Sequence, residues 1–167
     1  MTEKIYRSYL EIRSLGELKE VKKPSENYSV ELTHPKDFQL NKFFYKTIGK
    51  NCQWIDRLIW TDLNWIDYIS NDQLFTYILK DKSEIAGYFE LLFNKKSKDA
   101  EIAYFGILEE YYGKKLGGYL LSEAIKSSFN MGGERVWVHT CSLDHKNALK
   151  NYLARGMKNF KSEILIR

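Results

Sequence analysis

The sequence contains little cysteine, proline or histidine, with 2 Cys, 2 Pro and 3 His among 167 residues. Cys52 and Cys141 lie far apart and form no Cys-x-x-Cys motif, so we expect reduced, packed cysteines and no disulfide scaffold. No apolar run is long enough to span a bilayer, and the first residues lack the apolar segment of a secretory signal. These absences predict a cytoplasmic protein with no membrane partner.

A strong excess of one charge is also missing. The chain has 26 basic and 22 acidic residues, which leaves a net charge of +4. Without a clustered basic stripe, this balance argues against a dedicated nucleic-acid-binding protein. There is no internal repeat, low-complexity tract or linker, and we expect no metal site. The length suits one domain with a sizeable core, so residues 1–167 are predicted to form a single domain.

The most informative stretch runs from Glu101 to Leu121. Residues 101–107 are apolar in both alternating sets, which is typical of a strand buried on both faces. Three glycines and two lysines follow in 113–118, and apolar residues then recur at helical spacing from Leu116 to Phe129. A strand, a glycine-rich turn and a helix N-terminus can together hold a phosphate through free backbone N–H groups. An ordinary tight connection explains the glycines equally well at this point.

The rest of the chain predicts a meander before this unit and a second strand–helix–strand unit after it. Before the unit we expect an edge strand or short arm in 6–21, a strand in 28–33, a helix in 37–48 closed by Gly49, two short helices in 51–71 with Thr61 or Asp62 capping the second, and strands in 74–79 and 84–93. The helix of the unit should end in 130–133 with a glycine in the left-handed conformation. After it we expect a strand in 135–141, a helix that Asp144 caps and Gly156 ends, and a strand in 160–166. The helix between strands 101–107 and 135–141 predicts that these two strands are parallel.

This succession from Leu74 onward resembles the GCN5-related N-acetyltransferases (GNAT superfamily). One motif is the turn Tyr112–Gly117, which corresponds to the family pattern Arg/Gln-x-x-Gly-x-Gly/Ala. Only its last glycine fits: Tyr112 stands in the Arg/Gln place and Lys115 in the first Gly place. The other motif is Asn147–Met157, which is similar to the family's Asn-x-x-Ala/Lys-x-x-Tyr-x-x-x-Gly-Phe segment.

The resemblance implies an α/β (α+β) fold: a mixed, mostly antiparallel sheet with a splayed parallel strand pair, flanked by helices. Residues 1–72 would be an N-terminal strand and helices that shape the acceptor site. Residues 73–167 would be the cofactor-binding core.

The resemblance also implies acetyl-CoA as cofactor. Its pyrophosphate would accept hydrogen bonds from the turn at the positive end of the helix, and its pantetheine arm would pair with the end of the preceding strand, where Gly106 is compatible with a bulge. The cofactor-binding residues are then expected to be Phe105, Gly106, Ile107, Tyr112, Gly113, Lys114, Lys115, Leu116, Gly117, Gly118 and Asn147. Glu109 and Glu110 could instead occupy the helix N-terminus themselves, which would leave no room for an anion.

Acetyl transfer to an amine needs a base and an acid. Glu101 is the expected general base, because partial burial would raise the pKa of its carboxyl toward the useful range. Glu90, His139 or a chain of waters could replace it. Tyr152 corresponds to the general acid of the family, and Cys141 is expected to serve packing.

The acceptor is expected to be a primary amine of a small molecule or peptide, held near Trp54, Trp60 and His139 by apolar and cation–π contacts. The sequence does not identify that amine, and the acyl group could be longer than acetyl. A non-catalytic acyl-CoA-binding module stays open as an alternative, and an RNA-binding domain is a weaker one. The protein could be a monomer or a homodimer.

Overall fold

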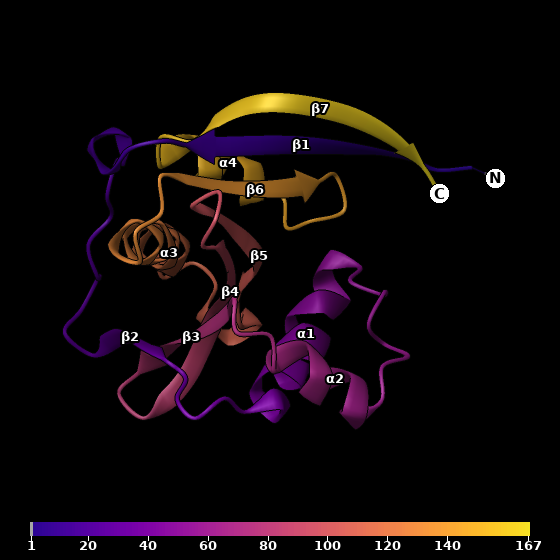
Figure 1. Ribbon diagram of the computed structural model, residues 1–167, viewed down its shortest axis with the longest axis horizontal. Helices are drawn as coiled ribbons and strands as arrows, with labels where there is room; N and C mark the ends of the chain where they lie inside the picture. The colour runs from indigo at the N-terminus through magenta and orange to yellow at the C-terminus, as the bar shows by residue number, and fades with distance from the viewer. Residues whose placement is uncertain (1) are drawn as a thin grey trace.

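A computed structural model describes residues 2–167 of the chain (Figure 1). The sheet is built from seven strands, and their bounds are β1 (Lys4–Ile12), β2 (Tyr28–Leu32), β3 (Leu74–Asp81), β4 (Glu84–Asn94), β5 (Asp99–Ile107), β6 (Arg135–Cys141) and β7 (Lys158–Ile166). The helices are α1 (Phe38–Cys52), α2 (Asp62–Ile69), α3 (Leu116–Asn130) and α4 (Ala148–Ala154), with 3-10 turns η1 (Leu15–Glu17) and η2 (Glu109–Tyr111).

The strands form one mixed sheet in the order β2-β3-β4-β5-β6-β1-β7. Neighbours pair antiparallel except β5 and β6, which are parallel, as the intervening helix predicted. Their parallel register covers only three residue pairs, from Asp99–Arg135 to Glu101–Trp137. Beyond Glu101 the two strands separate. The splayed parallel pair expected from the sequence is therefore present.

The bend of β5 at this point has a local cause. Tyr104 pairs with Glu90 and Ile102 with Leu91, so Ala103 is an extra residue on β5. Such a bulge bends a strand and increases its twist, which turns the end of β5 away from β6. The expectation of a bulge at Gly106 is wrong. A side chain at Gly106 would come within 2.6 Å of Ile48 Cγ2, so the missing side chain there lets α1 pack closely on β5.

The N-terminal strand lies inside the sheet, between β6 and β7 (Figure 1). Arg7 is opposite Cys141 on one side and Glu163 on the other. The expectation of an edge strand or short arm in 6–21 is therefore wrong. Leu10 and Ile12 in this segment are fully buried, and this apolar burial accounts for the interior position.

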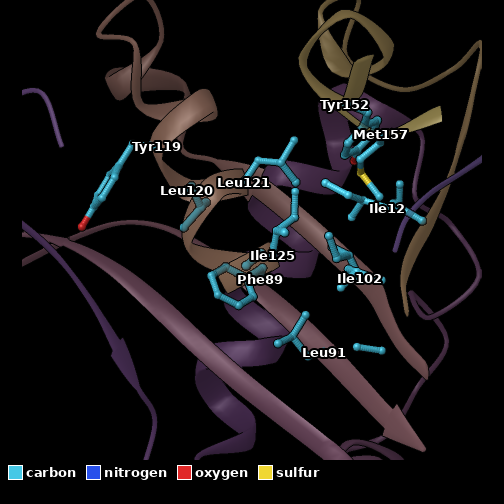
Figure 2. Packing of buried hydrophobic residues seen from close by; sticks show 14 of the residues in the cluster. Ile12, Phe89, Leu91, Ile102, Tyr119, Leu120, Leu121, Ile125, Tyr152 and Met157 are labelled. Atoms are coloured by element: carbon cyan, nitrogen blue, oxygen red, sulfur yellow. The ribbon is translucent and has the colours of Figure 1, made fainter. Parts of the chain in front are cut away.

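Helices cover both faces of the β3–β4–β5 half of the sheet (Figure 1). On one face α3 packs its apolar stripe on the strands, and Leu120, Leu121 and Ile125 join Phe89, Ile102 and Met157 in the main core, as Figure 2 shows. On the other face α1 contributes Phe44 and Ile48 to a second cluster with Tyr88. None of the helices in residues 2–167 combines the length and the apolar character of a membrane span.

Three predicted helix boundaries change. Helix α1 continues past Gly49 to Cys52, because Trp54 folds back so closely that a Cβ at Gly49 would lie 2.8 Å from Trp54 Cβ. Residues 53–61 form turns, and only α2 is a regular helix there, with Thr61 as its predicted cap. Helix α4 begins after Asn147; Asp144 instead accepts hydrogen bonds from the Thr140 hydroxyl and the Cys141 N–H.

Candidate functional site

A cavity of about 1260 Å³ occupies the gap between the diverging ends of β5 and β6. Its wall also includes the turn before α3, the start of α4, the loop after α1, and the paired ends of β1 and β7. The loop after α1 carries Trp54, a predicted acceptor residue, whereas the paired ends of β1 and β7 were not predicted, because they come from segments far from either motif.

Most of the predicted site residues line this one cavity. They are Glu101, Phe105, Gly106, Ile107, Tyr112, Gly113, Lys115, Leu116, Gly117, Gly118, His139, Asn147, Tyr152 and Trp54. Lys114 and Trp60 are not among its lining residues. Lys114 extends over the Tyr111 ring, 5.5 Å from its centroid, and Trp60 packs elsewhere, as described below.

The turn before α3 presents backbone N–H groups to the cavity. Gly113 and Lys115 both have left-handed backbone conformations, with φ of 77° and 62°. Lys115 is the N-cap residue, and its side chain makes no capping bond. The N–H groups of the first helical residues have no partner within an α-helix, and no residue in 2–167 accepts from those of 113–118.

The two acidic residues before the turn do not fill this space. Glu109 and Glu110 are exposed, and Glu109 contacts only the Asn51 side chain, at 3.5 Å, among the described side chains. The helix N-terminus is therefore open to an external anion, and the positive end of the helix dipole favours one.

The side chain of Glu101 is partly buried in the cavity wall at the last parallel pair of β5 and β6. Burial raises the pKa of its carboxyl, and no residue in 2–167 pairs with it. A carboxylate in this state is a stronger base than an exposed one. The predicted base thus has a suitable environment.

Tyr152 reaches the same cavity from α4. The residue is 6% exposed, and its ring lies edge-on to Phe105 of β5 with centroids 6.4 Å apart. Burial raises the pKa of its hydroxyl well above the ordinary value, so the group keeps its proton at neutral pH. Its hydroxyl makes no hydrogen bond with residues 2–167.

Two further residues that line the cavity were not predicted from the sequence. Asn151 Nδ2 donates to the Gly117 carbonyl at 3.0 Å and so ties α4 to the turn. The His145 ring packs edge-on against Tyr112, 5.0 Å between centroids. The signal for Asn151 was its place one turn after Asn147 in the same motif; nothing in the sequence indicated His145.

The loop after α1 is held by a buried cation. The Arg57 guanidinium lies 4.1 Å from the ring centroid of Tyr68 and 4.2 Å from that of Tyr104, and 4.6 Å from Trp60. Its Nη1 atom is 3.8 Å from Glu90 Oε1. Trp60 therefore covers this cation and is not placed to contact a ligand in the cavity.

Glu90 is fully buried and does not line the cavity. The Tyr68 hydroxyl donates to its Oε1 at 2.5 Å, and Asn41 Nδ2 donates to its Oε2 at 2.8 Å. These partners and Arg57 occupy both carboxylate oxygens. The structure thus gives Glu90 a structural environment and not the position of a substitute base.

His139 is exposed at the cavity wall, and its ring lies near Tyr9, 5.7 Å between centroids. Neighbouring protein atoms and the positive charge of Arg7 lower the pKa of His139, so the ring is neutral at pH 7. Cys141 also faces the cavity, and burial raises the pKa of its thiol. Both cysteines are free, as expected.

Comparison with solved structures gives the same fold. A GCN5-related N-acetyltransferase from Sphaerobacter thermophilus superposes with a TM-score of 0.69 at 14% identity, over 97% of this chain and 50% of that one. A functionally unknown conserved protein from Staphylococcus epidermidis superposes with a TM-score of 0.67 at 14% identity, over 99% of this chain and 62% of that one. An aminoglycoside acetyltransferase from an uncultured soil metagenomic sample gives 0.65 at 14% identity, over 80% and 90%. This chain thus spans only about half to three fifths of the first two.

No curated protein matches the sequence. A family model does, and its match covers residues 39–157, which include the cavity-lining turn and both predicted proton-transfer residues. The match takes in well over half of the chain. On this match, with a fold and a cavity that agree with it, the chain belongs to the acetyltransferase (GNAT) family.

Proposed function

We propose that this protein transfers an acetyl group from acetyl-CoA to a primary amine by direct attack in a ternary complex. The observation that carries the proposal is that one cavity holds a row of unpaired turn amides, an unpaired carboxyl and a protonated phenol. The amides suit a phosphate, and the other two suit the proton transfers of amide formation.

The residues of the turn fit the pyrophosphate of coenzyme A. A Cβ at Gly113 would meet no atom within 4 Å, so space is open above that residue. The amides of 113–118 would hold the phosphates, Lys115 would add a positive charge, and Asn147 would bond the pantetheine arm. When bound, acetyl-CoA supplies a thioester carbonyl as the acetyl donor.

Glu101 acts as the general base in this proposal. An alkyl amine is protonated at neutral pH and must lose a proton before it attacks a carbonyl carbon. The raised pKa of the Glu101 carboxyl makes the carboxylate a better acceptor of that proton, either directly or through a water. The neutral ring of His139 lies in the same wall and could pass the proton onward.

Tyr152 acts as the general acid. Its hydroxyl holds a proton at neutral pH and has no acceptor within residues 2–167, so the proton is available for the departing thiolate sulfur. A covalent acetyl-cysteine step is disfavoured, because burial raises the pKa of the Cys141 thiol and leaves little thiolate to act as nucleophile.

A non-catalytic acyl-CoA-binding module is the second candidate. The observation in its favour is Lys115, whose side chain stands where the family pattern has glycine and whose backbone φ is 62°. Binding would then persist without turnover. The soil metagenomic neighbour is an acetyltransferase of aminoglycosides, which supports the enzyme reading at the level of fold.

The test measures free thiol release from acetyl-CoA with a panel of primary amines, for the native chain and for Glu101→Gln and Tyr152→Phe. The proposal expects turnover with at least one amine, lost in both variants while coenzyme A still binds by calorimetry. Coenzyme A binding without turnover on any amine would favour the binding module. Failure to bind coenzyme A would reject both candidates.

A further inference from the structure

Arginines bring positive charge into the cavity wall, where it can act on the acceptor. Three of the six arginines in the chain line the cavity: Arg7, Arg57 and Arg167. The acidic side chains that line the cavity are Asp56, Glu101 and Asp144. Burial raises the pKa of the Glu101 carboxyl, so this group holds a proton more readily than an exposed glutamate does.

Arg7 lines the cavity, and its guanidinium has no hydrogen-bond acceptor closer than 3.5 Å. Its Nε is buried without a hydrogen-bond partner, and Nη1 makes only 3.5 Å contacts with Tyr9 Oη and Glu163 Oε1. The same Glu163 oxygen already accepts the Tyr9 hydroxyl proton at 2.6 Å. An unpartnered buried N–H costs stability. Arg155 Nε is unpartnered in the same way but lies outside the cavity, whereas Arg7 lines the cavity and can offer its donors to a ligand there.

The position of Arg7 is set by the sheet and not by a loop. Arg7 is opposite Cys141 of β6 and Glu163 of β7, and Tyr9 is opposite His139 on the same strand face. Side chains two residues apart on a strand share a face, so Arg7 lies on the same face of the sheet as Tyr9 and His139, and Arg7 and His139 both line the cavity. On the loop after α1, Trp54 packs edge-on against Tyr104, 4.9 Å between centroids, and both rings line the cavity.

We propose that Arg7 recognises a carboxylate on the acceptor, so that the acceptor is an amino-acid-like amine with an apolar or aromatic body. This inference rests on the proposed function and names its substrate class. The planar guanidinium suits bidentate binding of a carboxylate, and Trp54 and Tyr104 suit the apolar body. Arg167 adds a second guanidinium to the cavity wall, and repulsion between like charges disfavours a polyamine.

Two of the three arginines outside the cavity, Arg13 and Arg135, have carboxylate partners within the protein, whereas Arg155 Nε has none. Arg135 forms a close ion pair with Glu11, and Arg13 donates from Nε to the same carboxylate at 3.2 Å. Their donors are engaged within the protein. Arg13 is therefore a matched control: it lies on the same end of the chain, carries the same charge and does not line the cavity.

The experiment compares L-phenylalanine, L-phenylalaninamide and spermidine as acceptors, for the native chain and for Arg7→Gln, Arg7→Lys and Arg13→Gln. The readouts are kcat/KM from thiol release and calorimetric binding of each amine to protein saturated with coenzyme A. We expect the native chain to prefer the acid over its amide by at least about tenfold, mostly through KM. Arg7→Gln should abolish this preference, Arg7→Lys should restore part of it, and Arg13→Gln should keep it.

The outcomes separate this inference from the function on which it rests. Turnover of spermidine or the amide in preference to the acid, or an unchanged preference in Arg7→Gln, overturns the inference and leaves the acetyltransferase proposal intact. If no amine is turned over, the acetyltransferase proposal fails. Calorimetric binding then tests the carboxylate site at Arg7 by itself. Tighter binding of the acid than of the amide, lost in Arg7→Gln, would then support the carboxylate site, and equal binding would overturn it.

Discussion

Arg57 Nη1 lies 3.8 Å from Glu90 Oε1, and this ion pair is buried where α1, α2 and the sheet meet. The guanidinium lies over the rings of Tyr68 and Tyr104, and these cation–π contacts stabilise its charge in place of water. The pair holds the loop after α1 against the cavity. It thus links the stability of the fold to the shape of the acceptor wall.

Replacing Arg57 should destabilise the protein strongly. Arg57→Met leaves the Glu90 carboxylate buried without its cation, and breaking a buried pair in this way costs about 3–5 kcal/mol. Burial already raises the pKa of Glu90, and the substitution raises it further, so protonation relieves the loss. Urea unfolding should therefore show a larger loss at pH 8 than at pH 5. Lys42→Met, which removes the exposed ion pair with Asp62, should cost less than about 1 kcal/mol.

The rate should depend on pH through Glu101. Its carboxyl must be ionised to accept a proton, and burial raises its pKa, so kcat/KM should rise with pH through a range above that of an exposed glutamate. Glu101→Gln should lower kcat/KM by about 10²–10⁴ and remove this dependence. Glu109→Gln, an exposed carboxyl outside the cavity, should keep both. If kcat/KM of Glu101→Gln still fell toward low pH as it does in the native chain, the general base would be another group.

Glu101 should also make the stability depend on pH, but in the opposite direction to the rate. A carboxyl with a raised pKa in the folded state binds a proton more tightly there than in the unfolded chain. The free energy of unfolding should thus fall as pH rises from the unfolded to the folded pKa of Glu101. Glu101→Gln should weaken this decline, measured by urea unfolding across pH 4 to 8. A steeper decline in the variant would contradict the assigned direction.

Tyr152 should matter for turnover and not for binding. Tyr152→Phe removes a hydroxyl with no partner in residues 2–167, so the melting temperature and the affinity for coenzyme A should change little. The value of kcat should fall by about 10²–10⁴, the usual contribution of a general acid. Tyr119 is equally buried, at 6% exposure, on α3 outside the cavity, and Tyr119→Phe should retain kcat. A full kcat in Tyr152→Phe would remove the acid from the mechanism.

A methyl group in the turn should weaken cofactor binding selectively. A Cβ at Gly117 would lie 3.5 Å from Asn151 Nδ2, an ordinary contact, so Gly117→Ala should fold normally. The methyl narrows the approach to the amides, and losing one hydrogen bond to a charged group would weaken coenzyme A binding roughly tenfold or more. Calorimetry tests this against Gly16→Ala, because a Cβ there would meet only Ser14 Oγ, at 4.0 Å, and Gly16 does not line the cavity. Equal affinities in the two variants would place the phosphates elsewhere.

The charge on Arg7 should be visible in the titration of His139. The pKa of His139 is lowered first by the neighbouring protein atoms that displace water from the ring and then by the positive charge of Arg7. Arg7→Gln should therefore raise that pKa toward the ordinary value, followed through the ring resonances by NMR. Arg13→Gln should leave it in place. No change in Arg7→Gln would mean that the two side chains are farther apart in solution.

Local patterns predicted the elements to which we assign cofactor binding. Residues 101–107, the turn and α3 are contiguous, so alternation, glycines and helical spacing were enough to place them together. The boundary at Gly49 was missed because Trp54 returns from outside the helix to cover that glycine. Tertiary packing here overrides the local signal for a helix end.

The acceptor side was harder to foresee for the same physical reason. Trp60 and Glu90 are residue types that often line ligand sites. In the structure both contact Arg57 instead. Arg7 drew no attention, because only the pairing of β1 with β6 and β7 brings it to the cavity. Single-sequence patterns contain no information about such long-range pairing.

The insertion of β1 between β6 and β7 has a consequence for how the chain is made. The first strand emerges from the ribosome early, but its partners lie more than a hundred residues downstream. Until both arrive, two rows of main-chain hydrogen-bonding groups and the apolar side of β1 remain exposed. Contacts so distant along the chain form slowly. The wall that carries Arg7 and His139 is therefore expected to be the last part of the molecule to assemble during synthesis.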